Sequence, residues 1–188
     1  LTGTIDNKVE KEMIQSLLKV PELIERILSK ADDIKAIADK YYMSNQFIFI
    51  GRGMNYPSAL EGALKLKEIS YIHATGYPAG ELKHGPIALI DSKLPVVCVA
   101  PNTSTYDKMF SNIQEVKSRK GKTIVIATEG NTEIKEYADD IIYIPDVHED
   151  LTPILAAIPM QLLSYYISLN LDCDVDQPRN LAKSVTVE

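Results

Sequence analysis

Short runs that are apolar on both faces alternate with helical patterns along most of this chain. Four runs rich in Val, Ile and Phe have the length of buried strands, and helical patterns separate them. A strand that is apolar on both faces must be covered on both faces, and in parallel sheets the connecting helices provide that cover. The sequence therefore predicts an α/β fold, a three-layer α-β-α sandwich around a parallel sheet. The expected strands are residues 47–50, 96–100, 123–127 and 141–144, with a weaker candidate at 75–77.

Two helical patterns precede the first strand, over residues 6–29 and 31–43. Pro21 stands where a further helix could begin, because the first helical position tolerates a missing amide. A length of 188 residues is typical of one domain with a full core. The expected divisions are N-terminal linker and packing helices at 1–45, the α/β domain at 46–171 and a C-terminal tail at 172–188.

The composition narrows the classes of function. The formal net charge is −6 and the pI is about 5.2, whereas nucleic-acid surfaces are normally basic, so we expect no nucleic-acid partner. Cys98 and Cys173 lack metal-ligand spacing, and His73, His84 and His148 are scattered. We therefore expect no metal and no cofactor. Free thiols also favour a reducing compartment, the cytoplasm.

Residues 151–171 contain no charged side chain and are long enough to span a membrane. The stretch nevertheless holds two prolines and several polar residues, and acidic residues flank it. We predict a buried packing helix or a dimer-forming helix, and no membrane partner. The N-terminus, which begins at Leu1, has no methionine and no hydrophobic signal core, so we expect a fragment of a longer protein.

Three charged side chains share one face of an otherwise apolar helical stretch. At about 100° per residue, Glu61, Lys65 and Glu68 fall within roughly 60° of arc. A helix that is apolar nearly all round is typically buried, where charges are costly unless they are paired or used. One interpretation is a pair of ordinary salt bridges. The other is a carboxylate positioned as a general base between an apolar wall and a cation. The flanking apolar residues are Leu60, Leu64 and Tyr71 on one side and Leu66 and Ile69 on the other.

Ligands of parallel sheets bind outside the carboxyl ends of the strands. The first expected strand ends at Gly51, and Tyr56 occupies the place of the third glycine of a dinucleotide fingerprint, so we expect no dinucleotide. The turn at residues 51–53 leaves room for an anion at a helix N-terminus. A packing or solvent role for Arg52 is the simpler interpretation.

The expected strand at residues 96–100 ends in a turn rich in hydroxyl groups, residues 102–105. Serine and threonine commonly cap helix N-termini. We therefore predict that Thr103 or Ser104 caps a helix that begins near Tyr106.

The last fifteen residues, 174–188, have neither strong helical nor strong strand periodicity. A disordered tail is one interpretation. In the other, Leu181, Val185 and Val187 anchor the segment, and Lys183 becomes a single cation on an anchored loop. An unprotonated lysine attacks carbonyl carbon, so Lys183 near a keto sugar would suit a Schiff-base role.

Three motifs resemble a known family. They are LEGALKLKE at residues 60–68, GELKHGP at 80–86 and DVDQPRNLAKSVTVE at 174–188. Together they are similar to the C-terminal sugar isomerase (SIS) domain of the glucosamine-6-phosphate synthase family, and the resemblance covers essentially the whole chain. It implies a five-stranded parallel sheet with helices on both faces, a flavodoxin-like arrangement.

The resemblance also implies an activity and partners. Enzymes of this family convert fructose 6-phosphate and glutamine to glucosamine 6-phosphate and glutamate, the first step of amino-sugar biosynthesis on the way to UDP-N-acetylglucosamine. An N-terminal glutaminase releases ammonia, and two tandem SIS domains perform the sugar chemistry. The implied partners are a phosphosugar, the upstream SIS and glutaminase domains, and a second subunit in a homodimer.

Residue roles follow from the resemblance in the same way. It implies that Glu68 moves a proton between C1 and C2, with Glu61 and Lys65 in its supporting network. His84 assists ring opening in the active site of the neighbouring subunit. Lys183 forms the Schiff base.

The resemblance further places Ala182 and Lys183 in the substrate-binding region. The Ser-x-Ser-Gly-x-Thr loop of phosphate-holding SIS domains is absent, since residues 102–105 lack its glycine pattern. We therefore expect the chain to contribute to a site that it cannot complete alone. The alternatives are a non-catalytic SIS module that senses a phosphosugar or forms a dimer, and a deglycase that runs the reaction in reverse. The synthase-like ending weakens the last.

Overall fold

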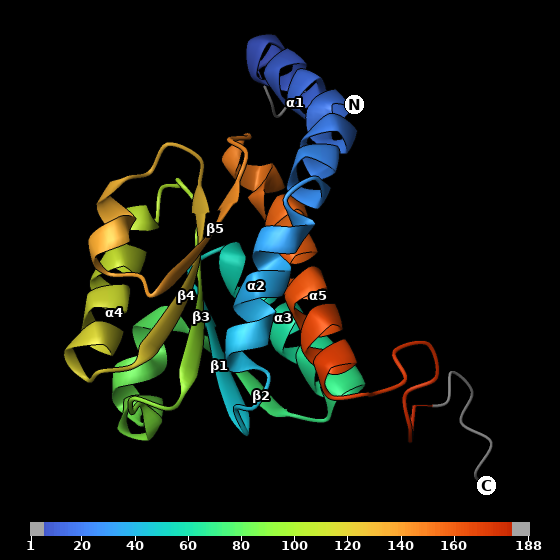
Figure 1. Cartoon of the computed structure of the whole chain (residues 1–188). Helices are drawn as coiled ribbons and strands as arrows, with labels where there is room; N and C mark the ends of the chain where they lie inside the picture. Colours follow the sequence, from blue (N-terminus) through green and yellow to red (C-terminus); the bar gives the residue numbers. More distant parts are fainter. Residues whose placement is uncertain (1–5, 182–188) are drawn as a thin grey trace, which may run out of the picture.

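A five-stranded parallel sheet in the order β2-β1-β3-β4-β5 forms the centre of the computed structural model, which describes residues 6–181 (Figure 1). All four apolar runs are strands, and the weaker candidate is the edge strand β2. The predicted parallel sheet is confirmed. The strands are β1 Gln46–Gly51, β2 His73–Pro78, β3 Pro95–Ala100, β4 Lys122–Thr128 and β5 Asp140–Ile144.

Alternate residues of each strand enter opposite cores, because successive side chains of a strand point to opposite faces. Phe47 and Phe49 of β1 lie in one core, and Ile48 and Ile50 lie in the other. The predicted three-layer sandwich is therefore confirmed. The first core is covered by α1 Asn7–Leu28, α2 Ala31–Tyr41, α3 Asn55–Ser70, η4 Glu149–Leu151 and α5 Thr152–Asn170. The second is covered by α4 Tyr106–Ser118 and by η1 Ala79–His84, η2 Pro86–Leu89 and η3 Glu133–Glu136.

The N-terminal helix departs from the sequence prediction at Pro21. Helix α1 continues through this residue, so the prediction of a second helix beginning there is wrong. A proline inside a helix removes the bond to the carbonyl four residues earlier, here that of Leu17. Both residues lie on the exposed side of α1, where water can hydrate the freed carbonyl, while Leu23 and Ile27 are buried. The first half of α1 extends beyond the sheet (Figure 1).

Helix α5 is the uncharged stretch of the sequence. By length and composition alone the segment Glu149–Asn170 could cross a membrane, yet half of it lies inside the fold. Leu155 and Ile167 are buried against the sheet layer, whereas Ile154 and Tyr165 are exposed on the outer side. The predicted packing role is confirmed for the inner face of α5.

Candidate active site

The charged stripe of α3, which consists of Glu61, Lys65 and Glu68, forms a connected cluster. Nζ of Lys65 lies 2.6 Å from Oε2 of Glu68 and 3.9 Å from Oε1 of Glu61. The hydrogen bond to Glu68 raises the pKa of Lys65 above its usual value, against the opposing effect of partial burial. Lys65 therefore remains an ammonium ion throughout the neutral range, and Glu68 faces a permanent cation.

The stripe is partly open to solvent. The side chains of Glu68 and Lys65 are 27% and 34% exposed. Leu60 and Leu64, beside them, are 41% and 42% exposed, so the prediction of a helix buried nearly all round is wrong.

Small residues explain which face of α3 is buried. A Cβ atom at Gly62 would lie 2.5 Å from Sδ of Met160 and 2.9 Å from the ring of Phe49, so the helix approaches both α5 and β1 closely there. Ala63 and Leu66 are buried in the same core. This packing directs the charged stripe away from the sheet.

A groove of about 780 Å³ lies beside Lys65 and Glu68, and the C-terminal segment forms its other wall. Small-molecule sites typically have volumes of about 300–1,000 Å³. The groove thus offers room for a ligand next to a carboxylate that is paired but not saturated. The C-terminal residues that line it are Val175, Asp176, Gln177, Pro178 and Leu181.

The described part of the C-terminal segment is held by its own turn and by α3. Oδ1 of Asp174 accepts hydrogen bonds from the backbone amides of Asp176 and Gln177, at 3.0 and 2.9 Å. The hydroxyl of Tyr71 accepts the amide hydrogen of Arg179 at 2.8 Å. The guanidinium of Arg179 stands 4.1 Å from the centre of the Tyr71 ring, in cation–π geometry.

Sequence reasoning missed this anchor. Leu181, the expected anchor within the described residues, is about half exposed. Tyr71 was seen only as an apolar flank of the stripe. The tyrosine itself is the signal in the sequence, because its hydroxyl can accept a hydrogen bond and its ring can contact a cation. Val185 and Val187, and the site residues Ala182 and Lys183, lie outside the described residues.

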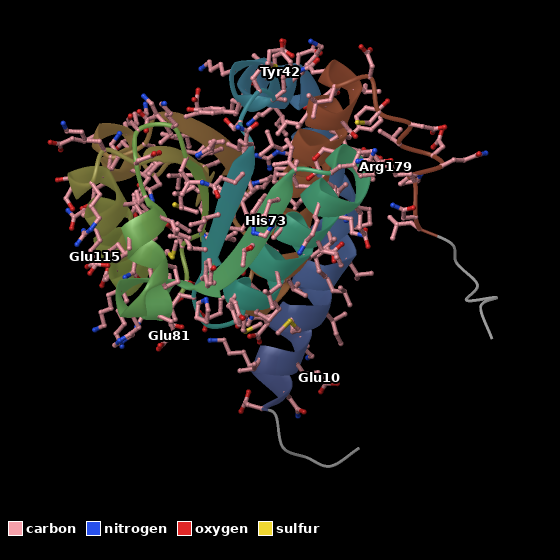
Figure 2. The ribbon with its side chains drawn as sticks, turned by 90° about the horizontal axis from the view of Figure 1, so that it is seen from below. Glu10, Tyr42, His73, Glu81, Glu115 and Arg179 are labelled. Carbon is pink, nitrogen blue, oxygen red and sulfur yellow. The ribbon has the colours of Figure 1, made fainter. Side chains whose placement is uncertain are left out.

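His84 lies near the opposite end of β2 from Glu68. It ends η1, beyond the carboxyl end of β2, and is exposed. Glu68 stands near the end of α3, beside the amino end of the same strand, which begins at His73. Figure 2 shows Glu81 of η1 well apart from Arg179. One chain therefore brings Glu61, Lys65 and Glu68 together but does not bring His84 to them.

A carboxylate of the chain itself closes the turn after β3. The backbone amide of Ser104 donates to Oε2 of Glu149 at 2.8 Å, and this bond lowers the pKa of Glu149. Two hollows border this turn, one of about 110 Å³ and a more open one of about 430 Å³, and Glu149 lines both. Nη1 of Arg52 donates to Oδ1 of Asn112 at 3.1 Å, which is a packing contact.

The predicted helix cap at this turn is wrong. Helix α4 begins at Tyr106, but its N-cap residue is Thr105, which makes no side-chain capping bond. The hydroxyl of Thr103 lies 3.1 Å from that of Thr105, and the backbone amide of Ser104 donates to the carboxylate of Glu149. The hydroxyl groups bond within the turn and leave the helix end uncapped.

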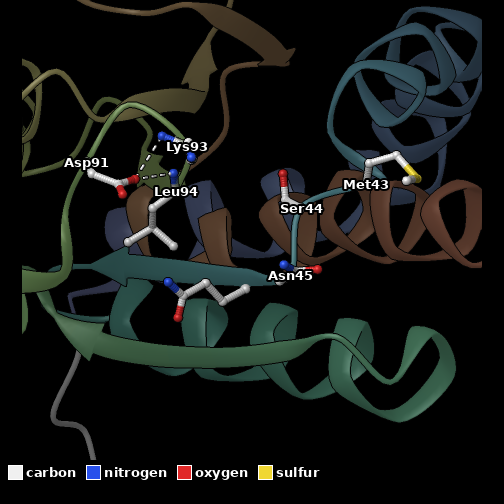
Figure 3. Close-up of a pocket in the computed structure, with 7 residues that line it drawn as sticks. Met43, Ser44, Asn45, Asp91, Lys93 and Leu94 are labelled. Atoms are coloured by element: carbon white, nitrogen blue, oxygen red, sulfur yellow. Dashed lines mark hydrogen bonds between the residues drawn. The ribbon is translucent and has the colours of Figure 1, made fainter.

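A further hollow of about 410 Å³ lies at the amino ends of β1 and β3 (Figure 3). Asp91 is the only carboxylate among the described residues that line it, and its Oδ1 accepts the amides of Lys93 and Leu94 at 2.8 and 3.0 Å. Met43, on the opposite wall, is 72% exposed. This hollow borders a local turn, and its polar side chains do not converge on one point as they would in a binding site. Within residues 6–181, no cluster of His, Cys, Asp and Glu could hold a metal.

Comparison with known proteins gives one consistent result. A family model for the SIS domain matches residues 40–171. The chain is 53% identical to the isomerizing glutamine–fructose-6-phosphate aminotransferase of Thermus thermophilus over 99% of its length, and 54% identical to that of Chlorobaculum tepidum over 98%. It spans only 31% and 30% of those relatives.

A solved structure is also similar. The C-terminal domain of glucosamine-fructose-6-phosphate aminotransferase from Francisella tularensis superposes with a TM-score of 0.81 at 42% identity. The match covers 87% of this chain and 46% of that one.

Proposed function

Since this chain belongs to the SIS domain family, we propose that it is the C-terminal sugar-handling domain of an isomerizing glutamine–fructose-6-phosphate aminotransferase. The whole enzyme converts fructose 6-phosphate and glutamine to glucosamine 6-phosphate and glutamate. Identity of 50–54% to aminotransferases of that name over nearly the whole chain supports the proposal. The observation that carries it is the Lys65–Glu68 pair at a groove walled by the C-terminal segment.

The sugar chemistry uses the two walls of the groove. The amine of Lys183 attacks C2 of the open-chain ketose and releases water, which leaves an imine. Ammonia displaces the lysine from that imine and regenerates its amine. Glu68 then takes a proton from C1 and returns it to C2, while the proton of the C1 hydroxyl passes to the imine nitrogen. C1 is thereby oxidised to an aldehyde while C2 is reduced and keeps the nitrogen, so that no external oxidant or reductant is needed.

Proximity in the sequence to a groove residue supports the role of Lys183. Leu181 lines the groove beside Glu68. Lys183 follows Leu181 by two residues in the sequence. Ala182, between them, belongs to the substrate-binding stretch in this proposal.

The separation of His84 from Glu68 supports a shared site in a homodimer. In this proposal His84 opens the sugar ring in the active site of the neighbouring subunit, and Glu61 and Lys65 hold Glu68 in place. The upstream SIS and glutaminase domains supply the phosphate-binding loop and ammonia. The chain works in the cytoplasm, where fructose 6-phosphate is available.

Borohydride trapping with fructose 6-phosphate, read by peptide mass spectrometry, tests the proposal. We expect a reduced sugar adduct confined to Lys183 in the full-length polypeptide. Lys65 provides an internal control, because its raised pKa keeps it protonated and unable to attack a carbonyl. The absence of an adduct in the full-length polypeptide, or an adduct at Lys65, would contradict the proposal and favour a non-catalytic phosphosugar-binding module.

A further inference from the structure

Tyr71 connects the end of α3 to the C-terminal segment. It is the C-cap residue of the helix that carries Glu68, and its hydroxyl and ring both contact Arg179. The two residues are separated by 108 positions in sequence. The contact therefore fixes the C-terminal segment relative to the Lys65–Glu68 pair, since both belong to the groove.

The backbone at Tyr71 makes tyrosine a costly choice for a helix cap. Its φ of 63° lies in the left-handed region, which glycine adopts without steric penalty and a tyrosine does not. Capping alone would be served better by glycine. The two contacts with Arg179 explain why a tyrosine rather than a glycine occupies this position.

The described C-terminal residues have few other attachments to the fold. Asp174 bonds only within its own turn, and Arg179, Asn180 and Leu181 are exposed. The hydrogen bond and the cation–π contact at Tyr71 are thus the polar contacts that join residues 174–181 to α3. Their loss removes the polar contacts that hold this wall of the groove to the end of α3.

We propose that Tyr71 is a positioning residue, which clamps the C-terminal segment at Arg179 and so sets the distance between that segment and Glu68. This inference rests on the proposed function and deepens it. It assigns the clamp to the end of α3 rather than to apolar residues of the segment. The clamp orders residues 174–181, the wall of the groove that precedes Lys183 in the sequence.

The test uses the full-length polypeptide with two substitutions at this position. Tyr71→Gly removes both contacts and relieves the backbone. Tyr71→Phe keeps the ring and removes only the hydroxyl that accepts the Arg179 amide hydrogen. Hydrogen exchange of the Arg179 amide, the melting temperature and the kcat for glucosamine 6-phosphate formation are measured for each.

For Tyr71→Gly we expect exchange at Arg179 to accelerate about 10–100-fold and kcat to fall by at least about tenfold, because two contacts are lost. The melting temperature should stay close to that of the unaltered protein. Tyr71→Phe should accelerate exchange only about fivefold and should recover most of kcat, since the cation–π contact remains.

Lys120→Gly is the matched control. Lys120 also has a φ of 63°, is exposed and follows α4, away from the groove. This change relieves the same kind of backbone strain at a site away from the groove. It should therefore leave Arg179 exchange and kcat unaltered.

Unchanged exchange at Arg179 in Tyr71→Gly would overturn the inference, and so would faster exchange with an unaltered kcat. If Tyr71→Gly lowers the melting temperature markedly, Tyr71→Phe decides by exchange alone: exchange at Arg179 about fivefold faster supports the inference, and unchanged exchange overturns it. Failure of the proposed function is distinguishable, because no sugar adduct would then form at Lys183 while the exchange result at Arg179 would stand by itself.

Discussion

Glu149 and Glu68 are carboxylates in two regions that a parallel α/β fold could use for a ligand. At the turn after β3, Glu149 accepts the backbone amide of Ser104 and lines two hollows, of about 110 and 430 Å³. On α3, Glu68 accepts one hydrogen bond from Lys65 and borders a groove of about 780 Å³. The first region satisfies its donor internally. The second leaves a charged pair beside open space.

This difference shows that the edge of the sheet alone does not locate the site. Ligands of parallel sheets usually bind at the carboxyl ends of the strands, where backbone amides are free. In this chain the amide of Ser104 at that edge is already occupied. Acceptors with unused capacity, such as Glu68, are a better guide than position in the fold.

The largest expected effect comes from removing the base at the open region. Glu68→Gln should lower the turnover of the full-length enzyme by about 10²–10⁴-fold with little change in KM for fructose 6-phosphate, because a general base typically contributes that much. Steady-state kinetics measure both constants. Glu149→Gln makes the same chemical change in the closed region and should leave turnover intact. Equal losses in the two variants would refute the comparison.

A carboxylate that is saturated with donors should matter for stability instead. Asp139 is such a group, because Oδ2 accepts the amide of Thr123 at 2.8 Å and Nζ of Lys117 at 2.9 Å. Burial alone would raise the pKa of Asp139, but these donors lower it below its usual value. Asp139→Asn should therefore reduce the free energy of unfolding by about 1–3 kcal/mol at neutral pH.

The sign of the pH dependence follows from the lowered pKa of Asp139. The stabilisation is complete above the pKa of an unfolded aspartate, about 3.9, and is lost as pH falls through the folded-state pKa. Urea unfolding of the unaltered protein and of Asp139→Asn should thus differ at pH 7 and converge in strong acid. A difference that grows in acid would contradict this assignment.

Local periodicity was enough to predict much of the architecture. Strands apolar on both faces identified the sheet, because burial on both sides constrains every residue of a run, as in β3. The 3.6-residue repeat likewise brought Glu61, Lys65 and Glu68 onto one face of α3. Both signals are contained within a few turns of chain.

Contacts between distant segments could not be predicted from such patterns. The bond from Arg179 to Tyr71 joins residues 108 positions apart, and that from Ser104 to Glu149 joins residues 45 apart. Both depend on how helices are arranged around the sheet. The exposure of Leu64 has the same origin, because it depends on which face of α3 approaches the other elements.

A smaller effect should follow from opening the closed region. Glu149→Gln keeps an acceptor for the amide of Ser104 but removes the negative charge, so the melting temperature should fall slightly at neutral pH. The hydrogen bond from Ser104 lowers the pKa of Glu149, so its contribution is present above the unfolded-state pKa and is lost as pH falls through the folded-state value. Thermal melts at pH 7 and pH 3 check this sign, since the difference between the two proteins should shrink as pH falls.

The smallest effect should come from Ser58, in the first turns of α3. Of the described residues, Ser58 has the one buried side-chain polar atom without a hydrogen-bond partner. An unsatisfied buried hydroxyl costs free energy, so Ser58→Ala should change the free energy of unfolding by about 0 to 1 kcal/mol in the stabilising direction. Ser70→Ala is the matched control, because the hydroxyl of Ser70 donates to the carbonyl of Leu66 and its loss should destabilise. If Ser58→Ala destabilised as much as Ser70→Ala, the hydroxyl of Ser58 would have a partner in solution, and this end of α3 would be open to water.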